Sequence, residues 1–285
     1  MSRPTCITLA ICACLIMISC SHKKDTLPTP AKEYDVFTDL AYSTDPLQKM
    51  DLYLPAGRSS ANTPLVIMVH GGGWTSGDKN SAFPLYLVQR FTDQGYAVAN
   101  INYRVAMDNT NKFPAQLEDI GAAIEYLYGR QLVLNINCEK IALFGRSSGA
   151  HLALLYGYTR NQHSRIKVVL DFFGPTDLTD PTIRDSTLKN ESEEFIGKPY
   201  DDNAQLWHDA SPIYNLTGAV PTYIFQGVYD ETVYPIQSQR LRDSLADRHV
   251  PYYYDEDLVG HGLDSAGWQK HLDIALPFIR PFMFY

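Results

Sequence analysis

The chain has 285 residues, of which 45% are hydrophobic and 20% are charged, and its formal net charge is −8. This length permits a full hydrophobic core, and this composition excludes a disordered protein. The acidic balance and the lack of a basic stripe exclude a typical nucleic-acid-binding protein, so we expect no nucleic acid partner.

The first 33 residues predict an export signal followed by a tether. Arg3 precedes an apolar run over residues 6–18, which is too short for a comfortable membrane span. The run ends in Ser19-Cys20-Ser21 and resembles the bacterial lipoprotein signal, although Met17 stands where that signal usually has Leu. We therefore expect a signal peptide over 1–19, a lipid anchor on Cys20 as the only membrane attachment, and a polar, Pro-containing tether over 20–33. The alternative is a plain secretory peptide, which would leave the protein periplasmic or secreted.

Cysteine usage limits the chemistry of the folded part. Four of the five cysteines, Cys6, Cys12, Cys14 and Cys20, lie in the leader, and only Cys138 remains beyond it. This excludes a disulfide framework and a cysteine metal cluster, and we interpret Cys138 as a bystander thiol.

Strands and helices alternate along residues 34–285. Strands are expected over 34–42, 49–54, 65–69, 96–103, 140–144, 167–173, 221–225 and 250–256. Helices are expected over 81–94, 114–128, 235–247 and 268–280, and the apolar pattern after residue 149 predicts another. This alternation predicts one α/β domain with a mostly parallel central sheet and helices on both faces. The polar segment 176–215 interrupts the rhythm, and we interpret it as a small cap or substrate-loop insertion over the site.

The segment Gly145-Arg146-Ser147-Ser148-Gly149 lies between a predicted strand and a predicted helix. This is the G-x-S-x-G pattern of a nucleophile elbow, a turn so tight that its neighbours must be small. We therefore predict that Ser147 is a nucleophile.

A second glycine-rich segment, His70-Gly71-Gly72-Gly73-Trp74, follows the strand at 65–69. Such a segment can direct backbone N–H groups at a developing oxyanion without obstructing side chains. We predict that Gly72 or Gly73 supplies one donor of an oxyanion hole and that Ser148 supplies the other. His70 itself is expected to hold the loop, and a glycine-rich turn with no chemical role is the alternative.

A serine nucleophile needs a histidine base and an acid, which follow it in the order Ser, acid, His in this type of fold. His261 lies in a loop after the last predicted strand and is the predicted base, whereas His271 and His151 lie inside predicted helices, and His249 directly precedes the strand.

Asp230, after the strand at 221–225, is the predicted acid, with Asp177 and Glu231 as its rivals. The acidic residues Asp255, Glu256 and Asp257 are interpreted as a solvated loop. Nothing in the spacing indicates a metal site, and the predicted chemistry requires no metal and no organic cofactor.

Several segments together resemble the α/β-hydrolase superfamily, and within it the carboxylesterase group of hormone-sensitive-lipase-like enzymes and the bacterial BD-FAE (feruloyl esterase-like) enzymes. The resemblance covers residues 34–282 and rests on His70–Trp74, Ser76–Lys79, Asn102–Arg104, Phe113–Gln116, Gly145–Leu152, Phe173–Leu178 and Ala210–Pro212. It implies the α/β-hydrolase fold, a catalytic triad of Ser147, Asp230 and His261, and an oxyanion segment of Gly72, Gly73 and Ser148. Ser148 stands where the family commonly has Ala, and Ala150 where it often has Gly.

The sequence therefore predicts an exported serine carboxylesterase that acts on short acyl or aryl esters through an acyl-enzyme. The resemblance, together with the 19 tyrosines, suggests acetyl or feruloyl groups on polysaccharides as substrates, although Tyr could simply fill strands and surface. The alternatives are an amide hydrolase of the prolyl-peptidase or aryl formamidase type, and a non-catalytic envelope binding protein on the same fold.

Overall fold

The computed structural model describes residues 34–184 and 186–285, which belong to one compact unit. The predicted signal peptide, Cys20 and the tether lie outside these residues. The described part contains an eight-stranded sheet in the order β1-β2-β4-β3-β5-β6-β7-β8. Its strands are β1 (Tyr34–Ala41), β2 (Lys49–Pro55), β3 (Pro64–Val69), β4 (Ala97–Ile101), β5 (Asn137–Arg146), β6 (Ile166–Phe172), β7 (Thr222–Gly227) and β8 (Tyr252–Asp257).

The sheet is mostly parallel, as predicted. Only the pairs β1–β2 and β2–β4 are antiparallel, and every pair from β4 to β8 is parallel. Parallel strands direct their carboxyl ends toward one edge of a sheet, where α/β proteins place their ligands. The predicted strands all exist, and their ends agree with the prediction to within three residues.

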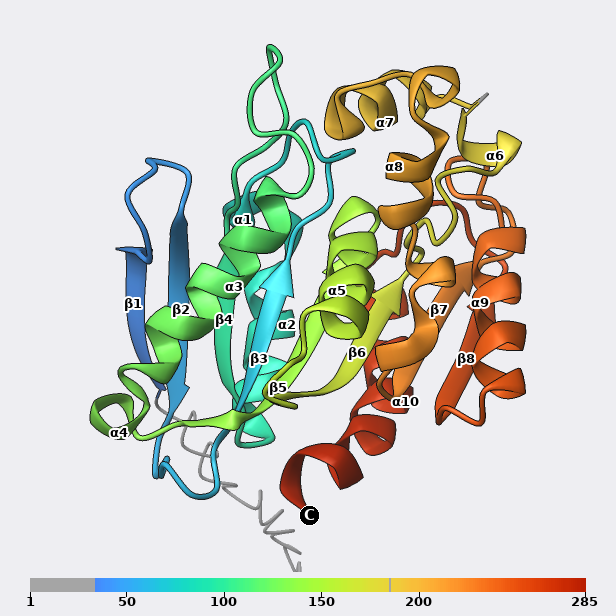
Figure 1. The fold of residues 1–285 in the computed structure, drawn as a ribbon. Helices are drawn as coiled ribbons and strands as arrows, with labels where there is room; N and C mark the ends of the chain where they lie inside the picture. Colours follow the sequence, from blue (N-terminus) through green and yellow to red (C-terminus); the bar gives the residue numbers. More distant parts are fainter. Residues whose placement is uncertain (1–33, 185) are drawn as a thin grey trace, which may run out of the picture. The chain divides into compact units, whose positions relative to one another are not determined.

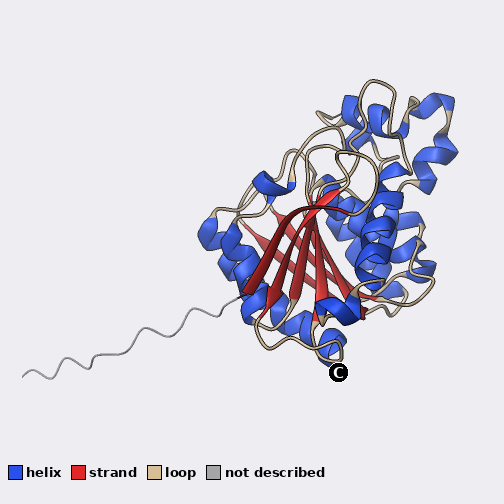
Figure 2. Cartoon of the chain, turned by 90° about the vertical axis from the view of Figure 1, so that its left-hand side faces the viewer, coloured by secondary structure: helices blue, strands red, loops and turns tan. Residues whose placement is uncertain are grey.

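Helices cover both faces of the sheet (Figures 1 and 2). They are α1 (Lys79–Ala82), α2 (Leu85–Asp93), α3 (Ala115–Tyr128), α4 (Gln131–Leu134), α5 (Ser148–Thr159), α6 (Pro181–Arg184), α7 (Lys189–Ile196), α8 (Ala204–Asp209), α9 (Ile236–Asp247) and α10 (Ser265–Phe284). Helices α3, α5 and α9 bury apolar side chains against one face, and α2 and α10 against the other. Successive residues of β3 point alternately into these two cores, which explains why the strand reads as a continuous apolar run.

Two helices differ from the expectation. The helix predicted over 81–94 is divided into α1 and α2 at Phe83-Pro84, where Phe83 is extended because the following proline disfavours the helical conformation. Helix α10 continues past residue 280 to Phe284 although it contains Pro277 and Pro281. Ile279 and Met283 are buried against the sheet, and this burial favours continuing the helix.

The insertion between β6 and β7 is largely helical. It contains α6, α7 and α8 together with the short 3₁₀ helices η1 (Tyr200–Asp202), η2 (Pro212–Tyr214) and η3 (Leu216–Gly218). Figure 1 shows α6, α7 and α8 gathered beyond the carboxyl ends of the strands. The insertion therefore stands at the edge of the sheet where the predicted site residues lie.

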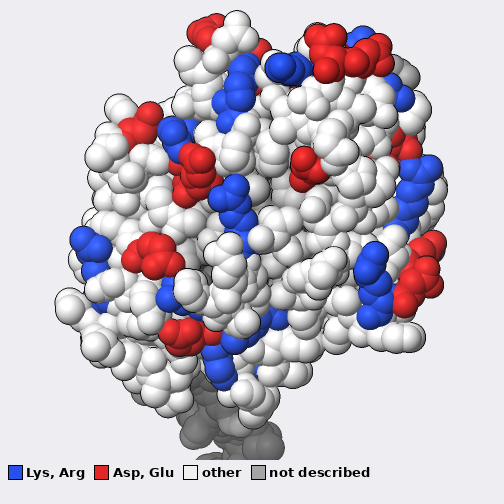
Figure 3. All heavy atoms as spheres, viewed as in Figure 1, with Lys and Arg blue, Asp and Glu red and all other residues white. Residues whose placement is uncertain are grey.

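Positive and negative side chains are interspersed on the face of the molecule seen in Figure 3. Within residues 34–184 and 186–285, no helix is both long and apolar enough to cross a membrane.

Candidate active site

Ser147 occupies a strained turn between β5 and α5. Its backbone has φ 53° and ψ −129°, a conformation that non-glycine residues rarely adopt and that is found at functional sites. A Cβ atom on Gly145 would lie 2.3 Å from the carbonyl oxygen of Gly149, and one on Gly149 would lie 2.2 Å from that of Val69. The prediction that the turn needs small residues on both sides is confirmed.

Ser147, His261 and Asp230 form a continuous hydrogen-bonded chain. The Nε2 atom of His261 lies 2.9 Å from Oγ of Ser147, and its Nδ1 atom lies 2.7 Å from Oδ2 of Asp230. Because a carboxylate only accepts hydrogen bonds, Nδ1–H donates to Asp230 and leaves Nε2 to accept the serine proton. The geometry is that of a nucleophile, a base and an orienting acid.

Several hydrogen bonds hold the carboxylate of Asp230 in position. Its side chain is buried, and Oδ1 accepts hydrogen bonds from the backbone N–H groups of Thr232 and Val233, both at 2.9 Å. Gln226 donates to Oδ2 at 3.3 Å and in turn accepts from Ser238. These contacts fix the carboxylate oxygen that orients the imidazole.

The loops that carry Asp230 and His261 pack on each other at the end of β7. The N–H of Tyr229 donates to the carbonyl of Val259 at 2.9 Å, and a Cβ on Gly227 would lie 2.4 Å from the carbonyl oxygen of Gly260. This close backbone contact places two residues 31 positions apart in the sequence within hydrogen-bonding distance.

The predicted oxyanion loop, His70–Trp74, lies directly beside Ser147. A Cβ on Gly71 would lie 3.1 Å from the Cβ of Ser147, and Gly72 and Gly73 have φ of +128° and +59°. Within the described residues, no acceptor is found for the backbone N–H groups of Gly72, Gly73 and Ser148. These N–H groups are therefore free to donate to a ligand next to the serine.

His70 and Tyr103 hold the predicted oxyanion loop in place. The His70 ring is stacked on Tyr103 at 4.2 Å, its Nδ1–H donates to the carbonyl of Gly71, and Tyr103 donates to the carbonyl of His70. Burial lowers the pKa of His70 and keeps the ring neutral. These contacts agree with the expectation that His70 holds the loop.

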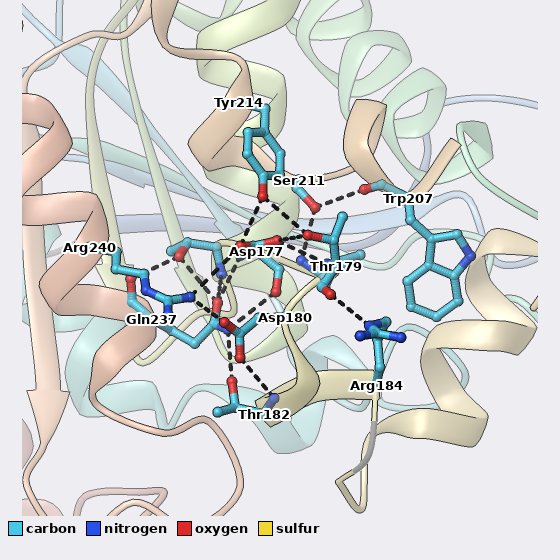
Figure 4. Close-up of polar contacts among 12 residues, drawn as sticks. Asp177, Thr179, Asp180, Thr182, Arg184, Trp207, Ser211, Tyr214, Gln237 and Arg240 are labelled. Atoms are coloured by element: carbon cyan, nitrogen blue, oxygen red, sulfur yellow. Dashed lines mark hydrogen bonds and ion pairs between the residues drawn. The ribbon is translucent and has the colours of Figure 1, made fainter. Parts of the chain in front are cut away.

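Asp177, the main rival acid, makes its contacts away from His261. It accepts hydrogen bonds from Thr179 and Tyr214, and it lies 3.9 Å from Arg240 on α9 (Figure 4). Glu231, the other rival, has an exposed side chain, and the carboxylate that His261 contacts is that of Asp230.

The interpretation of residues 255–257 as a solvated acidic loop was wrong. Asp255 and Asp257 belong to β8, and both contact His271 on α10, at 2.7 and 3.2 Å. His271 on α10 thus lies between two carboxylates of β8 and links the strand to the helix. His271 is thereby engaged in this link and does not contact Ser147.

His151 connects three parts of the site, which its position in a helix did not reveal. Its Nδ1 accepts from Trp74 Nε1 at 3.0 Å, and its Nε2–H donates to the carbonyl of Ala210 at 2.7 Å. Burial lowers its pKa to about 4 despite the hydrogen bond to Ala210. The neutral imidazole thus bridges the oxyanion loop, α5 and the end of the insertion.

No group of three or more His, Cys, Asp or Glu side chains suited to a metal ion occurs among residues 34–184 and 186–285. The only described cysteine, Cys138, is buried, and burial raises the pKa of its thiol to about 12. A thiol with such a pKa is a poor nucleophile.

Comparison with known proteins connects this site with esterases. The chain is similar to Esterase LipC (25% identity) and Esterase LipQ (28% identity) of Mycobacterium tuberculosis, and each alignment covers 78% of this chain. The alignments cover 59% and 55% of those relatives, so the chain spans little more than half the length of the curated relatives it matches.

Solved structures show the same fold at lower identity. A truncated form of a carbohydrate esterase from gut microbiota has a TM-score of 0.75 and 22% identity, covering 88% of this chain and 98% of its own. An esterase from Thermogutta terrifontis has a TM-score of 0.66 and 20% identity, and the alignment covers 90% of this chain and 94% of the esterase. The prediction of an α/β-hydrolase fold is confirmed.

The sequence model of one protein family matches residues 50–245, a range that runs from β2 through the elbow and the insertion into α9. Since that range covers more than half of the chain, and since the predicted resemblance pointed to the same group, this α/β-hydrolase belongs to the BD-FAE family.

Proposed function

We propose that this protein is a serine carboxylesterase that cleaves short acyl or aryl esters through an acyl-enzyme on Ser147. The observation that carries the proposal is the chain of contacts from Ser147 Oγ through His261 to Asp230, at 2.9 and 2.7 Å. The esterases among its relatives support the reaction class.

In the proposed reaction, His261 Nε2 takes the proton of Ser147 as Oγ attacks the acyl carbon. The amides of Ser148 and of Gly72 or Gly73 stabilise the oxyanion, each contributing about 3–4 kcal/mol to lowering the barrier. His261 then protonates the leaving alcohol, and the acyl group remains on Ser147. Water repeats the sequence with His261 as base, which releases the acid and restores the serine. Asp230 orients the imidazole and stabilises its cation.

For the substrate, we propose acetyl or feruloyl esters on polysaccharides. The support is membership of the BD-FAE family and the likeness in fold to a carbohydrate esterase. Glu191 and Phe195 of the insertion, proposed to span 176–215, lie against Gly73 and Trp74, so the insertion is suited to form a wall of the substrate pocket.

For location and domain organisation, we propose export by the segment 1–19, lipid attachment at Cys20 in the bacterial envelope, a tether over 20–33 and a catalytic domain over 34–285. Changing Cys20→Ala is expected to release the protein from the membrane fraction, as measured by fractionation and blotting. Continued membrane association of this variant would contradict the lipid anchor.

The activity is tested with the purified full chain on p-nitrophenyl acetate, p-nitrophenyl butyrate, methyl ferulate, acetylated xylan and a proline aryl amide. We expect turnover of the esters, and a loss of about 10⁴-fold or more in kcat for Ser147→Ala, because no other group can form the acyl-enzyme. Turnover of the amide alone would favour an amide hydrolase. Equal activity of the variant and the wild type would refute the role of Ser147.

A further inference from the structure

The side chain of Glu191 packs against the predicted oxyanion loop, with its carboxyl carbon 4.0 Å from where a Cβ on Gly73 would lie. It lies in the first turn of α7, and its Cγ would be 3.0 Å from a Cβ on Gly73. Two residues earlier in the same loop, Gly71 packs against the Cβ of Ser147. The insertion thus brings an acidic side chain next to the loop that we propose to bind the oxyanion.

The position of this carboxylate is fixed by the packing of α7. Phe195, one turn further along α7, is buried and stacks on Trp74 with 5.0 Å between ring centroids. The carbonyl of Phe195 also accepts a hydrogen bond from the N–H of Phe113 at 2.8 Å. Because Trp74 follows Gly73 directly, α7 and the oxyanion loop are held together, and Glu191 is held beside the loop.

The carboxylate of Glu191 has no partner within the described residues. Its Oε2 atom is buried without a hydrogen bond, and no ion pair involves it. Glu194, on the same helix, pairs with Lys112 instead. An unsatisfied buried acceptor is unfavourable, and a negative charge beside a developing oxyanion opposes catalysis. Both disadvantages are reduced if the bound substrate donates a hydrogen bond to this carboxylate.

A carboxylate accepts hydrogen bonds only, so the substrate must bring the donor. We propose that Glu191 is a specificity-determining residue that accepts a hydrogen bond from a free hydroxyl beside the ester, as in a partly acylated sugar. A hydroxyl fits better than an ammonium group, because the side chain is partly exposed and solvent weakens a purely ionic attraction. This inference rests on the proposed esterase function and specifies the alcohol side of its substrate.

The inference is tested with Glu191→Ala and Glu191→Gln in the full chain, with Glu193→Gln as the matched control on the same helix. Four substrates are compared: a monoacetylated methyl xyloside, its fully acetylated form, p-nitrophenyl acetate, and an amino-acid p-nitrophenyl ester. Circular dichroism melting confirms that the variants are folded. Ser147→Ala, assayed in parallel, tests the esterase function separately from the role of Glu191.

We expect wild-type kcat/KM to be higher for the monoacetylated sugar than for the fully acetylated one. Glu191→Ala should lower kcat/KM for the monoacetylated sugar about 10- to 100-fold, the loss of one charge-assisted hydrogen bond. For p-nitrophenyl acetate, which brings no donor, kcat/KM should stay the same or rise, because the charge that opposes the oxyanion is removed. Glu191→Gln should lower kcat/KM for the monoacetylated sugar less, because the amide oxygen still accepts a hydrogen bond. Glu193→Gln should leave kcat/KM unchanged for both substrates.

Four results would overturn the inference while leaving the esterase function intact. An equal loss of kcat/KM on all four substrates would indicate a structural role of Glu191, and an equal gain would indicate only repulsion of the oxyanion. A loss of kcat/KM confined to the amino-acid ester would indicate recognition of an ammonium group. The fourth result is no change of kcat/KM on any substrate. Wild-type activity on p-nitrophenyl acetate without activity on the sugar esters would likewise overturn it.

Discussion

Asp171 is a fully buried carboxyl group on β6, one strand away from the nucleophile. Its Oδ1 accepts from the N–H of Gly174 at 2.8 Å, whereas Oδ2 is buried without a partner among the described residues. Burial raises the pKa of Asp171 to about 7, and the hydrogen bond from Gly174 offsets this only in part. Because the pKa is higher in the folded protein, the contribution of Asp171 to the free energy of unfolding is fully present below about pH 4. This contribution is lost as the pH rises through about 7, where the buried carboxyl group must ionise.

Replacing Asp171→Asn should therefore stabilise the protein at alkaline pH. The amide keeps the acceptor for Gly174 but cannot ionise, so the gain at pH 9 should be a few kcal/mol, with about 4 kcal/mol as the upper limit for a shift of this size. At pH 4 the two proteins should be equally stable. Urea unfolding at a series of pH values measures this difference, and Asp201→Asn at an exposed position should show no such pH dependence. A difference that stays constant with pH would contradict the raised pKa.

Asp230 and Asp177 can be separated as candidate acids by the same substitution. Asp230→Asn should lower kcat about 10³- to 10⁴-fold, because an amide facing Nδ1 favours the wrong tautomer of His261. Asp177→Asn should change kcat less than tenfold, because its partners are Thr179 and Tyr214. Both are measured on p-nitrophenyl acetate, and a fully active Asp230→Asn would transfer the role to Asp177.

At the scale of elements, the insertion is anchored to α9 through Gln237. This buried side chain accepts from the backbone N–H groups of Thr176 and Asp177, at 2.9 and 2.7 Å, and donates to the carbonyl of Asp177 (Figure 4). Arg240, one turn later on α9, forms an ion pair with Asp180. The start of the insertion is thus bound to the helix that follows the Asp230 loop.

Gln237→Leu should lower the free energy of unfolding by about 3 kcal/mol, because it leaves two buried N–H groups without an acceptor. It should also speed hydrogen exchange over residues 176–184. Urea unfolding and exchange mass spectrometry measure the two effects. Gln205→Leu at an exposed position should change the free energy of unfolding by no more than a few tenths of a kcal/mol and should leave the exchange rate over residues 176–184 unchanged. An unchanged exchange rate would show that other contacts hold the segment.

The elements that the sequence predicts best are those in which pattern and burial agree. The strand at 65–69 is a continuous apolar run because both of its faces are covered, and the helix at 114–128 has a clear apolar face. The insertion could not be predicted in this way. Its short helices are held by contacts such as Phe195 on Trp74 and Gln237 on Thr176, which join residues that are distant in the sequence.

At the scale of the whole domain, the site depends on the parallel sheet. Ser147, Asp230 and His261 follow β5, β7 and β8 in turn, and the carboxyl ends of these strands lie at one edge. This common edge explains why the elbow motif, together with the chain order of the loops that follow the strands, pointed to the three residues that the structure brings together. The partners of His151 and the approach of Glu191 to Gly73 depend on the folded insertion, and no local sequence signal announces them.

The two cores on either side of the sheet should make most of the stability of this domain, and Phe144 tests one of them. It lies on β5 three residues before Ser147, is fully buried, and contacts the rings of Phe83, Phe91 and Phe172 at 5.0 to 5.7 Å. Phe144→Ala should cost about 3–5 kcal/mol, because the lost burial is increased by the cavity that remains. Since domains of this kind are stable by about 5–15 kcal/mol, the variant should remain folded but melt at a clearly lower temperature.

Leu132→Ala, at a side chain that is 75% exposed, should change the unfolding free energy by less than about 0.5 kcal/mol. Equal effects of the two substitutions in urea unfolding would show that this aromatic cluster adds little to stability.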